Sequence, residues 1–355
     1  MATANITVIG SLLIEHIFFI DRMPDLGESF PANDYMKGPG GKGANAAIAT
    51  YRACHGSPAT TSVSNDGGET DIKVRMVGAI GKDSEGEYMI EALEQSHVDS
   101  SGVRRETGIS TGKAFIMVEE TDESRDNRLI YTLGANVALT PNDFSTVESL
   151  SSGTRPDLII SQLEIDLKAV EMILETAGNA GIKVLLNAAP ANSILPALYR
   201  YVTHLVVNET EAAILSGCDL ADVNHENFEK IARGFLDYGV ENFVLTLGED
   251  GAYYANADGL AHVKAFTVES VDPTGAGDTF VGAYAAEYVR QQKAEEPWDI
   301  HKAVTRANAA GALTVMKPGG QTGIPWANEI NDFMVAATCG SQTGPGGALQ
   351  DEPNE

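Results

Sequence analysis

Two glycine-rich segments hold the residues whose types and spacing are best suited to chemistry. Residues 38–45 read GPGGKGAN, and residues 271–280 read VDPTGAGDTF. Each leads into a predicted helix, and the free backbone amides at a helix start attract anions. Glycine also allows a ligand to approach the backbone closely. The two segments are therefore candidate sites for a phosphate group.

The first segment fits neither of the common nucleotide motifs. Its glycines have the spacing of the dinucleotide fingerprint, but the residues before them are polar and do not predict a buried strand. Gly43 follows Lys42 where a P-loop has Ser or Thr. What remains is a row of backbone amides with Lys42 and Asn45 as further donors. Residues 35–53 contain two Lys, one Arg and no acid, which favours an anion site over a simple packing turn between helix and sheet.

The second segment offers a possible base as well as an anion site. Gly275, Ala276 and Gly277 precede a predicted helix that starts at Asp278, so their amides can surround an anion without a formal charge. Asp278 either complements the helix dipole or removes a proton from a hydroxyl that attacks phosphorus. We prefer the base, because two glycines flank Ala276 and the preceding residues from Asp272 form an oxygen-rich turn.

Two further turns follow predicted strands. Asn208 and Glu211 come directly after an apolar strand, and in the simplest interpretation they form a capping box. Ligands bind at the carboxyl ends of strands in open α/β sheets, so Glu211 could also hold hydrated magnesium. The turn from Thr246 to Gly251 suits a close approach of the backbone to a nucleotide, although any hairpin could have this composition.

Composition limits the possible partners. The 355 residues include 50 Asp and Glu against 24 Lys and Arg, which gives a net charge of −26. Such a chain is a poor partner for nucleic acid or an anionic membrane surface. The hydrophobic content of 43% predicts a globular protein, and no apolar run is long enough for a membrane span. The three cysteines follow no metal or disulfide pattern, so we expect a reducing, cytoplasmic and possible nuclear location.

Apolar runs typical of buried strands alternate with helical periodicity along most of the chain. The predicted strands are Ile6–Ser11, Lys73–Ile80, Lys113–Val118, Leu158–Ser161, Ile182–Leu186, His204–Val207 and Asn242–Thr246. The predicted helices are Lys42–Ala53, Glu85–Ser96, Lys168–Ala177, Glu209–Ser216, Asn227–Tyr238, Asp278–Arg290 and Ile300–Met316. Several strands are apolar throughout, which is typical of a parallel sheet covered on both faces. The predicted fold class is α/β: a doubly wound, mostly parallel sheet flanked by helices.

Two strand-rich stretches interrupt this alternation. Residues 14–37 and 110–133 show no helix pattern. They predict a small antiparallel β lid on a single domain of residues 1–334, or else a pair of ordinary edge hairpins. The polar stretch Thr61–Asp71 predicts a surface insertion. Residues 335–355, rich in Gly, Pro and acids towards the end, predict a disordered tail.

These motifs, in this order, resemble the PfkB family of sugar kinases, and its ribokinase branch in particular. The resemblance covers roughly residues 5–334, and the segments Gly40–Asn45 and Asp272–Phe280 are specific to the family. Agreement with the ribokinase branch comes from Gly134–Asn136, Leu139–Pro141, Asn187–Ala191 and Asn208–Ala212. The resemblance implies a ribokinase-like fold and ATP-dependent phosphorylation of a sugar primary hydroxyl. The expected reaction is D-ribose and ATP giving D-ribose 5-phosphate and ADP.

The resemblance also implies a role for individual residues. Asp278 would be the catalytic base, with Gly275, Ala276 and Gly277 as the anion hole. The sugar would be held by Glu15, Gly41, Lys42, Gly43, Asn45, Glu164 and Asp278. ATP would be surrounded by Asn208, Glu211, Thr246, Gly248, Gly251, Gly277 and Asn308, with Glu211 holding magnesium indirectly. Potassium would be bound by Asp272 and Thr274, with the backbone carbonyls of Thr314, Lys317 and Gly319 completing the site. The lid strands would also form the contact of a homodimer.

Three positions depart from the ribokinase pattern. Ribokinases usually have Asn where Leu13 stands and Asp where Glu15 stands, and both positions face the sugar hydroxyls. Gly323 stands where ribokinases often have Ser, near the potassium ion. Other acceptors therefore stay open, including a ketose, a sugar acid or a nucleoside. From a different class, the chain could be a non-catalytic sensor of a sugar or nucleotide, which would show no sugar-dependent ATP turnover.

Overall fold

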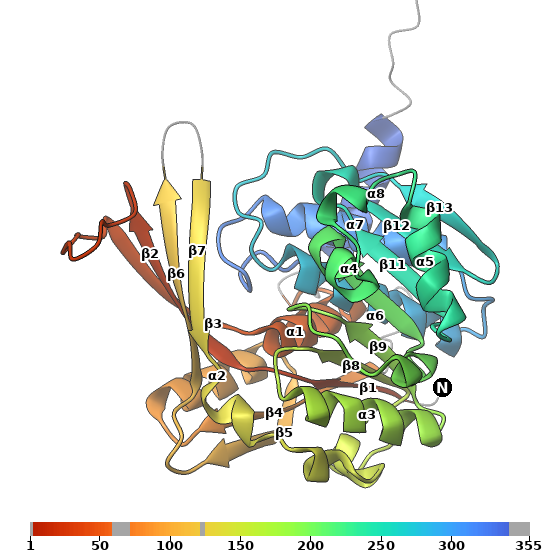
Figure 1. Ribbon diagram of the computed structural model, residues 1–355, viewed down its shortest axis with the longest axis horizontal. Helices are drawn as coiled ribbons and strands as arrows, with labels where there is room; N and C mark the ends of the chain where they lie inside the picture. Colours follow the sequence, from red (N-terminus) through yellow and green to blue (C-terminus); the bar gives the residue numbers. More distant parts are fainter. Residues whose placement is uncertain (1–2, 59–71, 121–124, 341–355) are drawn as a thin grey trace, which may run out of the picture.

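A mostly parallel sheet of nine strands runs through the centre of the computed structural model, which describes residues 3–58, 72–120 and 125–340 (Figure 1). The strands follow the order β13-β12-β11-β10-β9-β8-β1-β4-β5. Their bounds are Ala4–Ile9 (β1), Ile72–Gly81 (β4), Asp99–Glu106 (β5), Leu158–Gln162 (β8), Lys183–Asn187 (β9), His204–Asn208 (β10), Asn242–Thr246 (β11), Ala252–Asn256 (β12) and Gly259–Val263 (β13). The pairs from β11 to β5 are parallel, and β12 and β13 add an antiparallel edge.

Helices cover both faces of this sheet. They are Lys42–Cys54 (α1), Ser84–Gln95 (α2), Leu167–Asn179 (α3), Glu209–Ser216 (α4), Phe228–Asp237 (α5), Ala276–Lys293 (α6), Ile300–Val315 (α7) and Ala327–Gly340 (α8). Successive strand residues belong to opposite cores: Ile160 packs with α1, α6 and α7, whereas Ile159 packs with α3, α4 and α5. This two-sided burial explains the uninterrupted apolar runs, and it confirms the predicted α/β fold class.

The lid is a second, four-stranded sheet that rises from the main body (Figure 1). Its strand order is β3-β2-β6-β7, with bounds Leu13–Ile20 (β2), Asp34–Gly40 (β3), Gly112–Glu120 (β6) and Arg125–Thr132 (β7). The two outer pairs are antiparallel, as expected, but the central pair of β2 and β6 is parallel. The reason is topological, because β2 and β6 come from two separate hairpins that meet side by side.

Element boundaries differ from the predictions in a few places. Helix α6 begins at Ala276, two residues before the predicted start. Helix α8 continues to Gly340, so the first residues assigned to the tail are helical. Strands β5, β12 and β13 were not predicted: β5 and β13 are largely exposed or half-buried and give no apolar run, and β12, although mostly buried, is a short segment beside glycine-rich turns. The predicted insertion at 61–71 and the remaining tail residues 341–355 lie outside the described residues.

Short 3-10 helices complete the connections. They are Gly134–Ala138, Pro141–Phe144, Glu148–Leu150, Pro196–Tyr201, Leu220–Asp222 and Gly248–Asp250. The predicted turn from Thr246 to Gly251 therefore contains a short helical turn, Gly248–Asp250, after strand β11.

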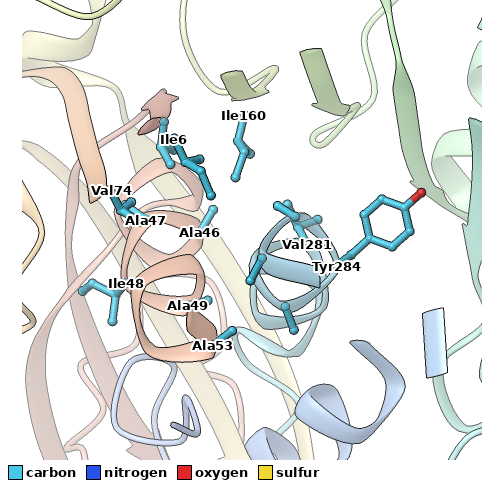
Figure 2. Packing of buried hydrophobic residues seen from close by; sticks show 14 of the residues in the cluster. Ile6, Ala46, Ala47, Ile48, Ala49, Ala53, Val74, Ile160, Val281 and Tyr284 are labelled. Atoms are coloured by element: carbon cyan, nitrogen blue, oxygen red, sulfur yellow. The ribbon is translucent and has the colours of Figure 1, made fainter. Parts of the chain in front are cut away.

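Helices α1 and α6 pack against each other at very short range (Figure 2). A Cβ atom on Gly282 of α6 would lie 2.5 Å from the Cβ of Ala49 on α1. The α1 side of the contact is made of small residues such as Ala46 and Ala53, and Val281 of α6 lies opposite (Figure 2). Close packing of this kind leaves no room for a larger side chain at the contact. It brings together the two glycine-rich segments, each of which opens one of these helices.

Candidate active site

The start of helix α6 places Asp278 and a row of backbone amides in one turn. Gly275 is the N-cap residue, with φ of 79°, and no side chain forms a capping hydrogen bond at this helix start. This left-handed conformation suits glycine, and a Cβ there would also lie 3.0 Å from the carbonyl oxygen of Gly320. Because the helix starts at Ala276, the amides of Ala276 and Gly277 lie inside its first turn. The Ala276 amide itself donates to the carbonyl of Pro273 over 3.2 Å, so the anion site at this turn stays a prediction that rests on its place at a helix start.

Asp278 is buried and oriented by a neighbour from the first glycine-rich segment. Its side chain is 8% exposed, and its Oδ2 accepts a hydrogen bond of 3.0 Å from the Nδ2 of Asn45. Gln321 in turn donates to the Oδ1 of Asn45 over 2.9 Å. The other Asp278 oxygen has no side-chain donor among these contacts, so a ligand hydroxyl can approach it.

The start of helix α1 is held in place through Glu164. The N-cap residue is Gly41, with φ of 88°, and again no side chain caps the helix. The backbone amide of Lys42 donates to Glu164 over 3.0 Å, and the hydroxyl of Ser11 donates to the same carboxylate oxygen. Glu164 thus ties the loop after β8 to the residues that follow β1.

The charges of this region influence one another. Asp278 above all, and then Glu164, Glu211 and Glu15, raise the pKa of the Lys42 ammonium group. Burial raises the pKa of the Glu15 carboxyl to about 7, and the neighbouring Asp278 and Glu164 carboxylates add to this rise. Burial likewise raises the pKa of Glu211. The site is negative overall in the absence of ligands and cations.

Two cavities meet at this point. The first, of about 290 Å³, lies between the lid and the main domain. Its lining residues are Leu13, Glu15, Gly41, Lys42, Asn45, Ala114, Ile116, Leu129, Tyr131, Glu164, Thr274, Gly275 and Asp278. All but one of the predicted sugar-binding residues are among them. The exception is Gly43, whose amide donates to Ser11 and whose missing Cβ leaves room for the backbone of Gly10.

The second cavity, of about 630 Å³, lies on the other side of the α6 start. Its lining includes the predicted nucleotide residues Thr246, Gly248, Gly251, Gly277 and Asn308. Asn308 donates to the carbonyl of Val263 over 3.1 Å, which fixes its side chain at the cavity wall. The segment from Pro273 to Asp278 thus separates the two cavities and lines both of them.

Asn208 and Glu211 form the predicted capping box at the start of α4. Asn208 accepts the amide of Glu211, and Glu211 accepts the amide of Asn208, each over 2.8 Å. Neither residue lines the second cavity. Burial raises the pKa of the Glu211 carboxyl, Lys42 lowers it and Asp278 raises it further. The capping role is thus established, and the nearby carboxylate leaves a magnesium role open.

The predicted potassium residues gather beside the anion site. The Asp272 carboxylate accepts the amides of Thr274 and Gly319, each over 2.9 Å. A Cβ on Gly323 would lie 2.8 Å from the carbonyl oxygen of Thr314 and 3.4 Å from that of Gly319. Both carbonyls accept backbone hydrogen bonds, that of Thr314 from the Lys317 amide over 3.2 Å and that of Gly319 from the Gly323 amide over 3.3 Å, so the potassium site stays a prediction. Lys317 is exposed, and its amine pairs with Glu329 over 3.5 Å.

Several site residues were not predicted from the sequence. The lid contributes four further lining residues to the acceptor cavity: Ala114, Ile116, Leu129 and Tyr131. The nucleotide cavity is also lined by Ala265, Phe266, Thr267, Val268 and Ser270. Ser11 and Gln321 position Glu164 and Asn45. The lid residues follow the alternation of a strand with one face on a ligand, which is a usable signal once the strand pairing is known. The isolated Gln321 has no comparable signal.

Two general findings constrain the chemistry. Within the described ranges, no helix combines the length and apolar character needed to cross a membrane. The same part of the chain holds no cluster of three or more His, Cys, Asp or Glu side chains that could bind a metal by themselves. Cys54 is a buried cysteine, and burial raises the pKa of its thiol to about 12, which makes it a poor nucleophile.

Comparison with known proteins agrees with this geometry. Residues 3–327 match the pfkB family carbohydrate kinases. The chain is 35% identical to the ribokinase of Schizosaccharomyces pombe over 331 residues, which cover 92% of this chain and 96% of that protein. It is 32% identical to the deoxyribokinase of Salmonella typhi over 332 residues, covering 93% and 98% respectively.

A solved structure gives the same answer for the fold. The crystal structure of ribokinase from Thermotoga maritima superposes with a TM-score of 0.73 at 29% identity, covering 94% of this chain and 99% of that one. Both the family match and the relatives span nearly the whole described chain. This chain belongs to the pfkB family of carbohydrate kinases.

Proposed function

We propose that the protein transfers the γ-phosphoryl group of ATP to the primary hydroxyl of a neutral sugar of the ribose type. The sugar would occupy the cavity of about 290 Å³, and the nucleotide would occupy the cavity of about 630 Å³. Relatives named ribokinase and deoxyribokinase support a pentose as the acceptor.

The observation that carries this proposal is the position of the α6 start between the two cavities. Asp278 and Gly275 line the acceptor cavity, whereas Ala276 and Gly277 line the nucleotide cavity. A phosphoryl group that crosses from one cavity to the other must pass the amides of this turn. Preorganised amides stabilise the charge of a transferring phosphoryl group without needing to reorganise.

The reaction then follows from the placement of Asp278. Its carboxylate accepts the proton of the sugar hydroxyl while the hydroxyl oxygen bonds to the γ-phosphorus. The bond between that phosphorus and the oxygen bridging to the β-phosphate breaks, and ADP leaves with the electron pair. Asn45 fixes one oxygen of Asp278, so the other oxygen is the one that receives the proton.

Two cations complete the proposal. Magnesium, held indirectly by Glu211, would neutralise phosphate charge, since magnesium sites commonly combine one carboxylate with substrate phosphates. Potassium would be held near Asp272 by the carbonyls of Thr314 and Gly319, with Thr274 and Lys317 as further candidates. A site with this many carboxylates and few basic side chains has a physical need for both cations.

The charge of the acceptor cavity favours a neutral sugar over a sugar acid. Glu15, Glu164 and Asp278 line it, and Lys42 is the cation among its described lining residues. A carboxylate or phosphate on the acceptor would meet the Glu164 and Asp278 carboxylates, and Glu15 as well once it ionises near pH 7, which is unfavourable in a partly buried site. The sugar-acid alternative is therefore the weaker one.

The experiment is an assay of ADP release with ATP, magnesium and potassium against pentoses, hexoses, ketoses, a sugar acid and a nucleoside. We expect turnover with neutral pentoses, and phosphorus NMR should show a new sugar phosphate. Sugar binding by calorimetry without sugar-dependent ADP release would instead support the non-catalytic sensor. Fastest turnover with the sugar acid would contradict the charge argument.

A homodimer formed through the lid is also part of the proposal. Ile130 of β7 is 66% exposed, on the strand face opposite to Leu129 and Tyr131, which line the acceptor cavity. A large apolar side chain exposed on the outer face of the lid is a candidate contact with a second copy of the chain. Analytical ultracentrifugation of the unaltered chain and of Ile130→Glu tests this, and we expect the substitution to produce monomers. A location in a reducing compartment such as the cytoplasm is also proposed, because the three cysteines follow no disulfide pattern.

A further inference from the structure

Arg52, in the last turn of α1, is a partly buried arginine that the proposed reaction does not use. Its guanidinium group donates hydrogen bonds of 3.0 Å to the carbonyl oxygens of Gln321 and Ile324, and a longer one of 3.5 Å to the hydroxyl of Ser96. Within the described ranges, none of its hydrogen bonds reaches a carboxylate, and its buried Nε has no hydrogen-bond partner. Burial lowers the pKa of this guanidinium group, so keeping the charge there costs free energy.

The contacts of Arg52 hold the segment between α7 and α8 against α1. The guanidinium carbon lies 5.4 Å from the centroid of the Trp326 ring, just after the two carbonyls that Arg52 binds. An arginine at the end of a helix ordinarily complements the helix dipole. Arg52 does more than this, because its donors fix the backbone of a segment that is distant in the sequence.

Gln321, whose carbonyl Arg52 binds, directs its side chain towards the proposed base. Its Nε2 donates to Oδ1 of Asn45 over 2.9 Å, and Nδ2 of Asn45 donates to Oδ2 of Asp278 over 3.0 Å. If the Asn45 amide were turned by half a rotation, two donors would face each other at Gln321 and two acceptors at Asp278. The donor of Gln321 therefore fixes which end of Asn45 faces the base.

The backbone next to Gln321 also lies against the start of α6. A Cβ on Gly275 would lie 3.0 Å from the carbonyl oxygen of Gly320, and a Cβ on Gly320 would lie 3.4 Å from Cγ2 of Thr274. A displacement of Gln321 would therefore also displace backbone that touches the turn proposed as the anion hole.

We propose that Arg52 is a positioning residue for the base, and that it acts on Asp278 through Gln321 and Asn45. Its bonds to two carbonyls keep Gln321 where its amide meets Asn45. Asn45 then holds one oxygen of Asp278, so that the other stays directed at the acceptor hydroxyl. Arg52 lines neither the acceptor cavity nor the nucleotide cavity, and it lies about two helical turns from Asn45. This inference rests on the proposed kinase function and adds to it a residue outside both cavities.

The effect of this chain of contacts should appear in kcat rather than in KM. The contacts orient the base, whereas the groups that line the acceptor cavity stay in place when Arg52 is changed. The loss of one ordinary hydrogen bond corresponds to roughly 2- to 10-fold in an equilibrium or a rate. Changes at two residues of one network do not combine independently, so their effects should not multiply.

The test is a double-mutant cycle of Arg52→Lys and Gln321→Met, measured by ADP release with ribose. Lysine keeps the charge but lacks the planar fork that binds two carbonyls, and methionine keeps the length of glutamine without its donor. Each single variant should lower kcat by about 3- to 10-fold and change KM for the sugar by less than about threefold. The double variant should be no slower than the slower single variant. A fall equal to the product of the two single effects overturns the proposed action through Gln321.

A second cycle asks whether Arg52 acts on the base. In the Asp278→Asn background no base remains to be oriented, so adding Arg52→Lys should change the residual kcat by less than about twofold. The same fall in kcat with and without Asp278 would contradict the inference.

Arg290→Lys is the matched control. Arg290 on α6 donates to the carbonyl of Ala53 over 3.0 Å, so it also binds the last turn of α1, but it has no contact with Gln321. We expect Arg290→Lys to leave kcat unchanged even where urea unfolding shows lower stability. Lower stability of Arg52→Lys with an unchanged kcat would mean that Arg52 is purely structural. If Arg52→Lys does not fold, Gln321→Met decides, because an unchanged kcat there overturns the inference. Absence of sugar-dependent ADP release in the unaltered chain would instead contradict the proposed kinase function itself.

Discussion

The two walls of the acceptor cavity are built in different ways. The domain wall comes from the starts of α1 and α6, which pack tightly and are joined by the hydrogen bond from Asn45 to Asp278. The lid wall is an apolar sheet that leaves the main body and is held at its base (Figure 1). The domain wall holds the proposed reacting groups in place, and the lid wall determines which acceptor fits against them.

The attachments of the lid are few and local. Asp83 at the start of α2 accepts the amide and hydroxyl of Thr111. Asn136 holds both the amide and the carbonyl of Leu12, each over 2.9 Å. Further out, Glu85 pairs with His16 and Lys113 on the lid strands. The base of the lid is therefore firm, while its outer part depends on ion pairs.

This contrast teaches which changes should affect chemistry and which should affect binding. Changes on the domain wall alter groups that act on the transferring phosphoryl, so they should lower kcat. Changes on the lid wall should act mainly on KM and on the choice of sugar. Each prediction below tests this division.

The largest effect is expected from Asp278→Asn, which removes the proposed base and keeps the shape of the side chain. We expect kcat to fall by roughly 10²- to 10⁴-fold, the usual contribution of a positioned general base. Asp166→Asn is the matched control, because asparagine caps a helix as well as aspartate does at this N-cap. A variant that keeps more than half of its activity would show that Asp278 is not the base.

The next largest effect concerns Asp272, which orders the loop beside the anion hole. Asp272→Asn weakens its hold on the amides of Thr274 and Gly319, so we expect kcat to fall by about 10- to 100-fold. The unaltered chain should be more active in potassium than in a large organic cation, and the variant should lose most of this difference. Equal rates of the unaltered chain in both salts would contradict the potassium site.

On the lid wall, Glu15 gives a pH dependence of stability. Its pKa of about 7 in the folded chain lies above the ordinary value of 4.5. Between these values the folded state holds a proton that the unfolded state releases. The contribution of Glu15 to the free energy of unfolding is therefore present below pH 4.5 and is lost as the pH rises towards 7.

Glu15→Gln removes this dependence. Between pH 5 and pH 7.5 the free energy of unfolding of the unaltered chain should therefore fall by about 2 kcal/mol more than that of Glu15→Gln. Urea unfolding without ligand at both pH values provides the measurement. Glu91→Gln on the exposed face of α2 is the control and should follow the unaltered chain. If the free energy of unfolding changes equally with pH in Glu15→Gln and in the unaltered chain, the pKa of the Glu15 carboxyl is not raised in the folded state.

The smallest effect is expected from Glu85→Gln, which weakens the ion pairs of the outer lid. Partly exposed ion pairs contribute little, so KM for the sugar should rise by about two- to fivefold while kcat stays nearly constant. Glu87→Gln on the same helix breaks a pair with Arg105 on β5, away from the lid strands, and should leave KM unchanged. A fall in kcat in Glu85→Gln would show that the lid also positions the reacting groups.

Much of the domain wall could be predicted from local sequence. The segments that contain Lys42 and Asp278 have a glycine pattern that suits only a few backbone conformations, and the helices they open begin within two residues of the predicted starts. The main sheet was visible in its apolar runs. The lid wall was harder, because the side chains of β6 and β7 face the cavity only through pairing with strands distant in sequence.

The sequence by itself determined the fold class and the family, and it predicted the residues proposed for phosphoryl transfer, because each depends on short patterns of glycine, charge and hydrophobicity. The tertiary structure decided that Asn45 orients Asp278, that the α6 start divides two cavities, and that Leu13 and Glu15 stand side by side over the acceptor. These contacts join residues far apart in the chain. Local propensity carries no information on these distances. The close packing of α1 on α6 and the register of the lid strands set them.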